Sequence, residues 1–333
     1  MNISLFTVRA GLNPAVGFGY AAQHIVKSLT SLGHICTYAN PKADLQINFT
    51  QPSLYKLHKS QYQIGYTPWE STGMIDEWRE KMNLCDEVWA TSDWVAEVFK
   101  NNGVTKPIYV YNHGIEEAWV PKKRILKDGK PFKFLHIGEP APRKGGQMVV
   151  DAFIKLFGNN PDYELTIKAH NSNTIRVYDK DGNLTLPHLL YKNIKLITEE
   201  YSIEKLIKLH YEHHCLIYPS WGEGFGFIPL QALASGMPVI STYQWAQYKK
   251  YIGPLSLKAT LTGESLPKAV GDAHNGLMYK PNADHLEDLM IDVTSNYKAY
   301  FGYYYAQSTK IHEEYNWIEL TRKAFKHLEE KFK

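Results

Sequence analysis

Short apolar runs alternate with stretches of helical periodicity through the first third of the chain. Apolar runs of four to six residues are typical of buried strands, and they cover residues 3–8, 35–39, 45–49, 63–66, 87–90 and 108–111. Apolar side chains at helical spacing cover residues 20–32, 75–83 and 92–102. This alternation predicts a parallel sheet with helices on both of its faces.

The same alternation starts again at residue 132. The predicted strands of this second part are 132–137, 165–169, 194–197, 215–218 and 238–241, and its predicted helices are 146–157, 203–212 and 227–235. From Asp284 onward the chain is largely helical, and it ends in the amphipathic stretch 317–332. We therefore expect a second α/β unit followed by a long helical segment.

The segment between the two units reads as a linker. It is charged, poor in apolar residues and bounded by Pro121 and Pro131. The alternative is a long surface loop inside one domain, although structureless loops of this length are uncommon in compact domains. The expected organisation is a first domain over 1–121, a linker over 122–131, a second domain over 132–312 and a C-terminal helix over 313–333.

Composition adds a few constraints. The chain has 333 residues, of which 44% are hydrophobic, and this length suits two domains. A formal net charge of +3 permits an anionic partner without requiring one. Cys36, Cys85 and Cys215 form neither a C-x-x-C pair nor a disulfide framework, which favours a reducing, cytoplasmic setting. The N-terminus lacks a signal-peptide pattern, and no window is apolar enough for an integral membrane segment.

The loop after the predicted strand 215–218 contains Gly222, Gly224 and Gly226 and leads into a helix. Glycines allow backbone N–H groups to approach a phosphate, and the start of a helix favours negative charge. Glu223 lies within this loop and can accept hydrogen bonds from sugar hydroxyls. The alternative is a flexible turn with an exposed glutamate.

Two further segments carry candidate chemistry. Arg143 and Lys144 follow a Gly138 turn at the end of the strand 132–137 and are candidate site residues. A solvated start of a helix is the alternative there. Gly17-Phe18-Gly19 is predicted as a turn between the first strand and the first helix.

These motifs resemble those of family 4 of the retaining glycosyltransferases, which have the GT-B fold. Glu223 in a Gly-Phe-Gly loop and the segment from Ser235 to Val239 match the family signature, whereas Gln231 stands where the family has a second glutamate. Lys144 matches a family lysine, and Glu139 stands where the family often has an arginine. The specific part of the resemblance covers residues 132–240, and weaker agreement extends over nearly the whole chain.

The resemblance implies two Rossmann-like domains that face a central cleft, with a C-terminal helix that crosses back to the first domain. It implies catalytic roles for Lys144, Arg143, Glu223 and His113, of which His113 is also open to a purely structural role in its turn. The implied donor-binding residues are Gly17, Phe18, Gly19, Gly138, Gly224, Phe225, Gly226, Phe227 and Gln231. In this family the first glutamate contacts the donor sugar and the second the ribose hydroxyls.

Trp69 and Glu70 follow the predicted strand 63–66, and ligands gather beyond the carboxyl ends of strands in open α/β sheets. They are therefore predicted to bind the acceptor, Trp69 by stacking on a sugar face and Glu70 through its hydroxyls. A buried tryptophan followed by a helix-capping Ser71 is the alternative.

The implied activity is retaining transfer of a sugar from a nucleoside-diphosphate sugar, with no cofactor or metal required. The leaving phosphate would take the acceptor's proton. The acceptor is open between a glycan, a lipid, a small molecule and a modified nucleic acid. Two alternatives remain: a nucleotide-sugar epimerase using His113 and Glu223 as an acid/base pair, and a non-catalytic sugar-nucleotide-binding protein, as the departures Gln231 and Glu139 allow.

Two sequence patterns resemble metal-binding sites, but their context does not favour metal binding. Asp179 and Asp181 have the D-x-D spacing, but they lie at the tip of a predicted β-hairpin over 174–186, which we interpret as an inserted flap over the cleft. The cluster of His210, His213, His214 and Cys215 spans a helix end and a strand start without a second pair at zinc spacing.

Overall fold

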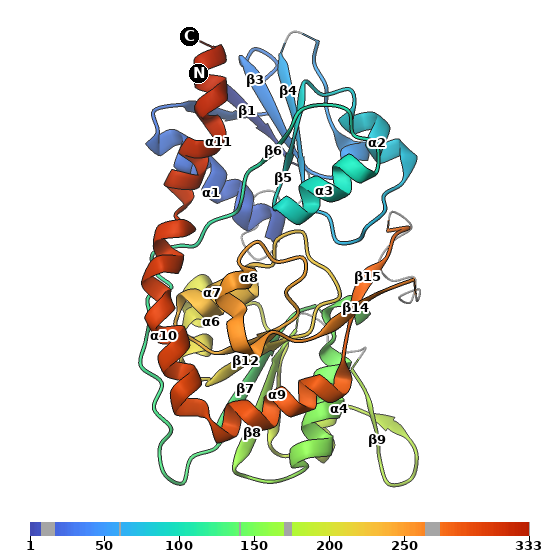
Figure 1. Ribbon diagram of the computed structural model, residues 1–333, viewed down its shortest axis with the longest axis vertical. Coiled ribbons are helices and arrows are strands. Elements are labelled where there is room, and N and C mark those ends of the chain that lie inside the picture. Colours follow the sequence, from blue (N-terminus) through green and yellow to red (C-terminus); the bar gives the residue numbers. More distant parts are fainter. Residues whose placement is uncertain (8–16, 60, 140, 170–174, 264–273, 333) are drawn as a thin grey trace.

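The computed structural model describes residues 1–7, 17–59, 61–139, 141–169, 175–263 and 274–332. Two parallel sheets, each covered by helices, lie one above the other along the longest axis of the molecule (Figure 1). The predicted fold class, two Rossmann-like units in an α/β protein, is confirmed. The predicted domain limits at 121, 131 and 312 stay a prediction.

The first sheet has six strands in the order β2-β1-β3-β4-β5-β6, and all neighbours are parallel. Its strands are β1 (Asn2–Phe6), β2 (Ile35–Tyr38), β3 (Leu45–Phe49), β4 (Tyr62–Thr67), β5 (Glu87–Ala90) and β6 (Ile108–Val110). Its helices are α1 (Gly17–Ser31), α2 (Asp76–Met82) and α3 (Asp93–Asn101). The expected turn at Gly17-Phe18-Gly19 is wrong, because these residues form the first turn of α1. Pro14, Ala15 and Val16, which precede it, lie outside the described residues.

The second sheet has five strands in the order β11-β8-β7-β12-β13. Its strands are β7 (Phe132–Ile137), β8 (Tyr163–Lys168), β11 (Ile194–Ile197), β12 (Cys215–Tyr218) and β13 (Val239–Ser241). Its helices are α4 (Gly146–Phe157), α6 (Ile203–Tyr211) and α7 (Phe227–Ala234). All four residues of β12 are buried, as expected of a central strand covered on both faces.

Two antiparallel pairs of strands lie outside these sheets. The predicted hairpin is present as β9 (Val177–Tyr178) and β10 (Leu184–Thr185), although Thr174 lies outside the described residues. It projects from the end of the second sheet that is remote from the first sheet, so its interpretation as a flap over the cleft is wrong (Figure 1). The second pair, β14 (Ala259–Thr262) and β15 (Met278–Pro281), was not predicted and extends toward the first sheet (Figure 1).

Three helices end the chain: α9 (Ala283–Ser295), α10 (Tyr297–Glu314) and α11 (Trp317–Lys331). Helix α10 packs on α7 of the second sheet, and α11 packs on α1 of the first. The Tyr111 hydroxyl lies 2.6 Å from the hydroxyl of Thr321 in α11, and His327 Nε2 lies 3.0 Å from both carboxylate oxygens of Glu87. The last helix therefore crosses back to the first sheet, as the resemblance implied.

Residues 122–131 contain no helix or strand, in agreement with a linker. They are nevertheless tied to the second sheet by Arg124, which is only 4% exposed. Its Nη1 donates to the Ser235 carbonyl (2.7 Å) and its Nη2 to the Ser235 hydroxyl (2.8 Å). A buried arginine inside a charged linker could not be predicted, because its partners come from a distant helix end.

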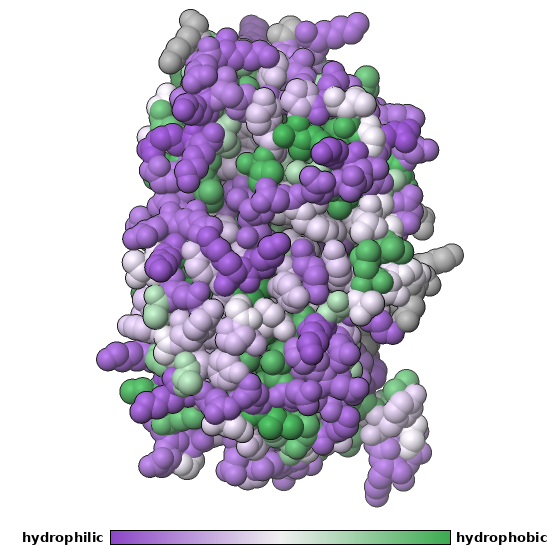
Figure 2. All heavy atoms as spheres, viewed as in Figure 1, coloured by the Kyte–Doolittle hydropathy of each residue, from purple (hydrophilic) through white to green (hydrophobic). Residues whose placement is uncertain are grey.

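Hydrophilic residues cover most of the visible face, where the apolar residues form separate small patches (Figure 2). Among the described helices, none is both long and apolar enough to cross a membrane.

The anchoring of α11 can be tested with Phe325→Ala. Phe325 is fully buried, and its ring centroid lies 5.1 Å from that of Trp89 in the first sheet. Its loss is expected to reduce the free energy of unfolding by about 3–5 kcal/mol, since it leaves a cavity in a packed core. Urea unfolding followed by tryptophan fluorescence measures this change. Ile318→Ala, at a position of α11 that is 37% exposed, is the control and is expected to cost less than about 1 kcal/mol. Equal losses would mean that α11 is not anchored through Phe325.

Candidate active site

A cavity of about 1410 Å³ separates the carboxyl ends of the two sheets. The first sheet contributes Phe49, which ends β3, and the second contributes Ile137, Lys168 and Tyr218, which end β7, β8 and β12. In open α/β sheets, ligands bind beyond these carboxyl ends. The cavity is therefore the candidate active site.

Glu223 is the centre of a buried polar cluster at this cavity. Its Oε1 accepts hydrogen bonds from Lys144 Nζ (2.6 Å), the Ser220 hydroxyl (2.6 Å) and the Tyr218 hydroxyl (2.9 Å), and it lies 3.2 Å from Arg143 Nη1. No described residue forms a hydrogen bond with Oε2. The expected alternative for this loop, an exposed glutamate in a flexible turn, is wrong because Glu223 is only 6% exposed.

The charges of this cluster determine its protonation. Burial alone would raise the pKa of Glu223, but Lys144 and Arg143 outweigh burial and lower the pKa to about 2. Burial lowers the pKa of Lys144, and the adjacent Glu223 partly restores it. At neutral pH one carboxylate thus faces two basic side chains.

The local fold explains how the two basic residues reach Glu223. Pro142–Lys144 form a single 3-10 turn (η3), which Gly145 ends with a φ of 72°. A Cβ on Gly145 would lie 2.5 Å from the Pro219 carbonyl oxygen, so the turn packs directly against the loop that follows β12. This packing places Arg143 and Lys144 beside Glu223.

The glycines of the loop 222–226 permit a close backbone contact that the sequence alone did not predict. A Cβ on Gly222 would overlap the Glu70 carbonyl oxygen, and a Cβ on Gly224 would overlap the side chain of Pro68. The backbone after β4 therefore lies directly on the glycine loop. These two glycines permit close contact between the domains.

The two predicted acceptor residues have different environments. Trp69 is 1% exposed, its Nε1 donates to the Gly73 carbonyl (3.0 Å), and its ring stacks on His274 at 4.1 Å. Stacking of Trp69 on an acceptor sugar is therefore wrong for this structure, since neither face of the ring is free. The helix-capping role of Ser71 is also wrong, because α2 begins after Ile75. Glu70 lines the cavity, with Oε1 3.7 Å from Arg143 Nη2.

His113 lines the cavity from the first domain and is 3% exposed. Its ring stacks on Phe227, with centroids 4.9 Å apart. Neither ring nitrogen has a hydrogen-bond partner among the described residues. Burial first, and then His24, lower its pKa to about 3, so the imidazole is neutral at neutral pH. It is equipped to form hydrogen bonds with a ligand.

Most of the predicted donor-binding residues line the cavity, but two of them do not. Those that line the cavity are Gly17, Phe18, Gly138, Gly224, Phe225, Gly226 and Phe227. Gly19 and Gln231 do not line it. Gln231 is 4% exposed, and its Oε1 has no partner in the described part of the chain.

Sequence reasoning missed Lys168 and Tyr201, which line the cavity on the side of the second domain. Lys168 Nζ lies 5.5 Å from the centroid of the Tyr201 ring. Lys168 ends β8, and Tyr201 follows the carboxyl end of β11. Trp69 and Glu70 were predicted because ligands bind beyond the carboxyl ends of strands. The same rule, applied to every strand, would have found Lys168 and Tyr201.

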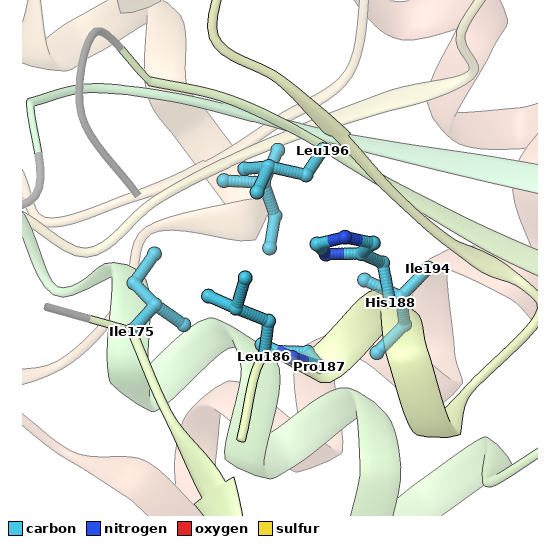
Figure 3. Close-up of a pocket in the computed structure, with 7 residues that line it drawn as sticks. Ile175, Leu186, Pro187, His188, Ile194 and Leu196 are labelled. Atoms are coloured by element: carbon cyan, nitrogen blue, oxygen red, sulfur yellow. The ribbon is translucent and has the colours of Figure 1, made fainter. Parts of the chain in front are cut away.

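No group of three or more His, Cys, Asp or Glu side chains among the described residues is arranged to hold a metal ion. His210 and His213 are bound to backbone carbonyls, with Nδ1 2.8 Å from the Leu206 oxygen and 2.6 Å from the Leu209 oxygen, respectively. A second cavity, lined by Ile175, Leu186 and His188, measures about 10 Å³ (Figure 3). It holds at most about one water molecule.

Two facing Rossmann-like units with a binding cavity between them define the class of GT-B proteins. Residues 118–256 match the family model of glycosyl transferases group 1. This match agrees with the predicted family and class of enzyme over that part of the chain, whereas the predicted roles of individual site residues stay a prediction.

Relatives are similar to this chain in sequence, and solved structures are similar in fold. An alpha-1,3/1,6-mannosyltransferase of Mus musculus is 26% identical in an alignment of 233 residues that covers 62% of this chain and 54% of that protein. The chain spans about half the length of the curated relatives it matches. Sucrose-phosphate synthase from Thermosynechococcus elongatus has a TM-score of 0.70 at 13% identity, covering 99% of both chains. Anabaena HepE in complex with UDP has a TM-score of 0.63 at 10% identity, covering 99% of this chain and 100% of that one.

The buried charge cluster can be tested with Glu223→Gln, which removes the counter-charge of two buried cations and should destabilise the fold at neutral pH. Because the pKa of Glu223 is depressed in the folded state, its stabilisation is fully present above its unfolded pKa of about 4.3. It is lost as the pH falls toward the folded value of about 2. The difference in free energy of unfolding between wild type and variant should therefore narrow by about 1–2 kcal/mol from pH 6 to pH 3.

Urea unfolding at the two pH values measures this difference. The control is Glu212→Gln, at a side chain that is 53% exposed, for which little change with pH is expected. A difference between wild type and Glu223→Gln that stays constant with pH would contradict the depressed pKa.

Proposed function

We propose that this protein is a retaining glycosyltransferase that moves a sugar from a nucleoside-diphosphate sugar to an acceptor. The observation that carries the proposal is the cluster of Lys144, Arg143 and Glu223 at the cavity between the domains. The donor lies against the second domain, and the acceptor enters along the first. The solved structure of the neighbour with bound UDP supports a nucleotide donor for this fold.

The two basic residues suit a diphosphate. Lys144 and Arg143 both pair with Glu223, and Arg143 Nη2 also lies 3.7 Å from Glu70 Oε1, so two cations lie side by side at the cavity. Fixed cations stabilise the charge that develops on a leaving nucleoside diphosphate without reorganising. Catalysis by these side chains requires no metal ion, and metal independence is part of the proposal.

Glu223 suits the donor sugar. Its Oε1 is held by three hydrogen bonds and an ion pair, which leaves Oε2 to accept hydrogen bonds from sugar hydroxyls. With a pKa of about 2, this carboxylate is a weak base. A phosphate, whose second pKa is about 6, is better suited to take the acceptor's proton. The proposed step is thus deprotonation of the acceptor hydroxyl by the leaving phosphate as the new glycosidic bond forms on the same face of the sugar.

The nucleotide-sugar epimerase has less support. An epimerase needs an acid as well as a base around the sugar ring. His113, with a pKa of about 3, and Glu223, with a pKa of about 2, are both deprotonated at neutral pH. The pair that the alternative invokes, His113 and Glu223, therefore offers two proton acceptors and no acid. A protein that only binds sugar nucleotides has no use for the acceptor side of a cavity of about 1410 Å³, to which Thr50, Gln51 and Leu54 contribute.

The donor site can be tested with Lys144→Ala. Isothermal titration calorimetry and thermal shift with UDP, GDP, ADP, CDP and TDP and their sugars are expected to show one base that binds to the wild type. Lys144→Ala should weaken this binding about tenfold or more, because a cation facing the diphosphate is lost, and EDTA should leave it unchanged. The control is Lys155→Ala, at a lysine of α4 whose side chain is 64% exposed. Failure of every nucleotide to bind the wild type would overturn the proposal.

The role of His113 can be tested with His113→Phe, which keeps the stacking on Phe227 and removes both ring nitrogens. Affinity for the sugar nucleotide is expected to fall about fivefold, the value of one hydrogen bond to the sugar. Affinity for the nucleoside diphosphate, which lacks the sugar, should stay the same and serves as the internal control. An equal loss for both ligands would mean that His113 does not contact the sugar.

A further inference from the structure

Glu70 extends from the first domain to the cation cluster of the second. It belongs to the loop 68–74, which follows β4 and lies on the glycine loop 222–226. Its Oε1 is 3.7 Å from Arg143 Nη2, and its Oε2 is 3.4 Å from His274 Nε2. The chain His274–Glu70–Arg143–Glu223 thus connects the two domains across the cavity.

The loop that carries Glu70 is firmly held. The Thr72 N–H donates to the Leu277 carbonyl (3.0 Å), and the Leu277 N–H donates to the Thr72 hydroxyl (2.8 Å). Trp69 stacks on His274 and meets Trp78 edge to face, with ring centroids at 4.1 Å and 4.8 Å, respectively. The position of the Glu70 carboxylate is therefore fixed by its neighbours on both sides.

Arg143 is shared between two carboxylates from opposite domains. Its Nη1 donates to the Gly222 carbonyl and lies 3.2 Å from Glu223 Oε1, while its Nη2 faces Glu70. A diphosphate that pairs with Arg143 would do so beside the Glu70 carboxylate, which already lies 3.7 Å from Arg143 Nη2. The two anions would repel each other and compete for one cation.

We infer that Glu70 is a positioning residue, an inference that rests on the proposed function. Its carboxylate holds Arg143 in the ligand-free protein and opposes binding of the diphosphate. On this basis Glu70 promotes release of the nucleoside diphosphate after sugar transfer, since its carboxylate recovers the guanidinium group as the product leaves. This role differs from acceptor binding, in which Glu70 would affect the acceptor alone.

The experiment is isothermal titration calorimetry without acceptor, using UDP, GDP and inorganic pyrophosphate as probes. Glu70→Gln, which is close in shape and uncharged, is expected to bind the nucleoside diphosphate about three- to fivefold more tightly than the wild type. Glu70→Ala should show the same gain, so the result does not depend on one variant. Glu70→Asp, which keeps the charge, should stay within about twofold of the wild type. Glu77→Gln, at an exposed position of α2, is the matched control and should have no effect.

The outcomes separate this inference from the proposed function. If the wild type binds no probe, the proposed function fails and the inference falls with it. If the wild type binds and Lys144→Ala weakens binding, but Glu70→Gln binds equally or less tightly, the proposed function stands and the inference is overturned. A gain that Glu70→Asp shares in full would indicate loss of loop packing and would also overturn the inference. Thermal melting of each variant confirms that it is folded.

Discussion

The direct backbone contact between the loop 68–74 and the glycine loop 222–226 is the constraint on which the site depends. Gly222 and Gly224 have no room for a Cβ, because Glu70 and Pro68 occupy that space. The Thr91 hydroxyl donates to the Gly224 carbonyl at the same contact. This approach sets the distance between the two sheets. It also brings Glu70 from one domain to Arg143 and Glu223 of the other.

The electrostatics of the cavity follow from that contact. Burying a charge is costly unless the charge is paired and hydrogen-bonded. Glu223 meets this condition through its three hydrogen bonds and two cations, all of them on Oε1. Arg143 is paired with two carboxylates, Glu70 and Glu223, each of which has another partner. Lys144 is paired with Glu223, which it shares with Arg143. The cluster is therefore paired well enough to fold while its cations remain available to an anionic ligand.

The sequence predicted well those features that depend on local pattern. The strands of both sheets and the helices α4, α6 and α7 lie within about two residues of their predicted limits, since each is a short apolar run or an amphipathic stretch. The predictions that failed depended on distant contacts. The Trp69 ring is covered by His274, which is 205 positions further along the chain. For the site, residue types and order singled out Lys144 and Glu223, which the structure places 2.6 Å apart, whereas the clash that requires Gly222 could be seen only in three dimensions.

The substitution of the family's second glutamate by Gln231 has a local physical explanation. Burial and the nearby Glu116 raise the pKa of Tyr20, and Gln231 acts against them, so these three side chains lie together. Glu116 is already ion-paired with His24 at 2.7 Å. A carboxylate at position 231, which is 4% exposed, would add a second negative charge to this buried group, with no described cation to balance it. The neutral amide avoids that cost. The departure at position 231 thus belongs to the packing of α1 against α7 behind the cavity, and the cluster of Lys144, Arg143 and Glu223 is left intact.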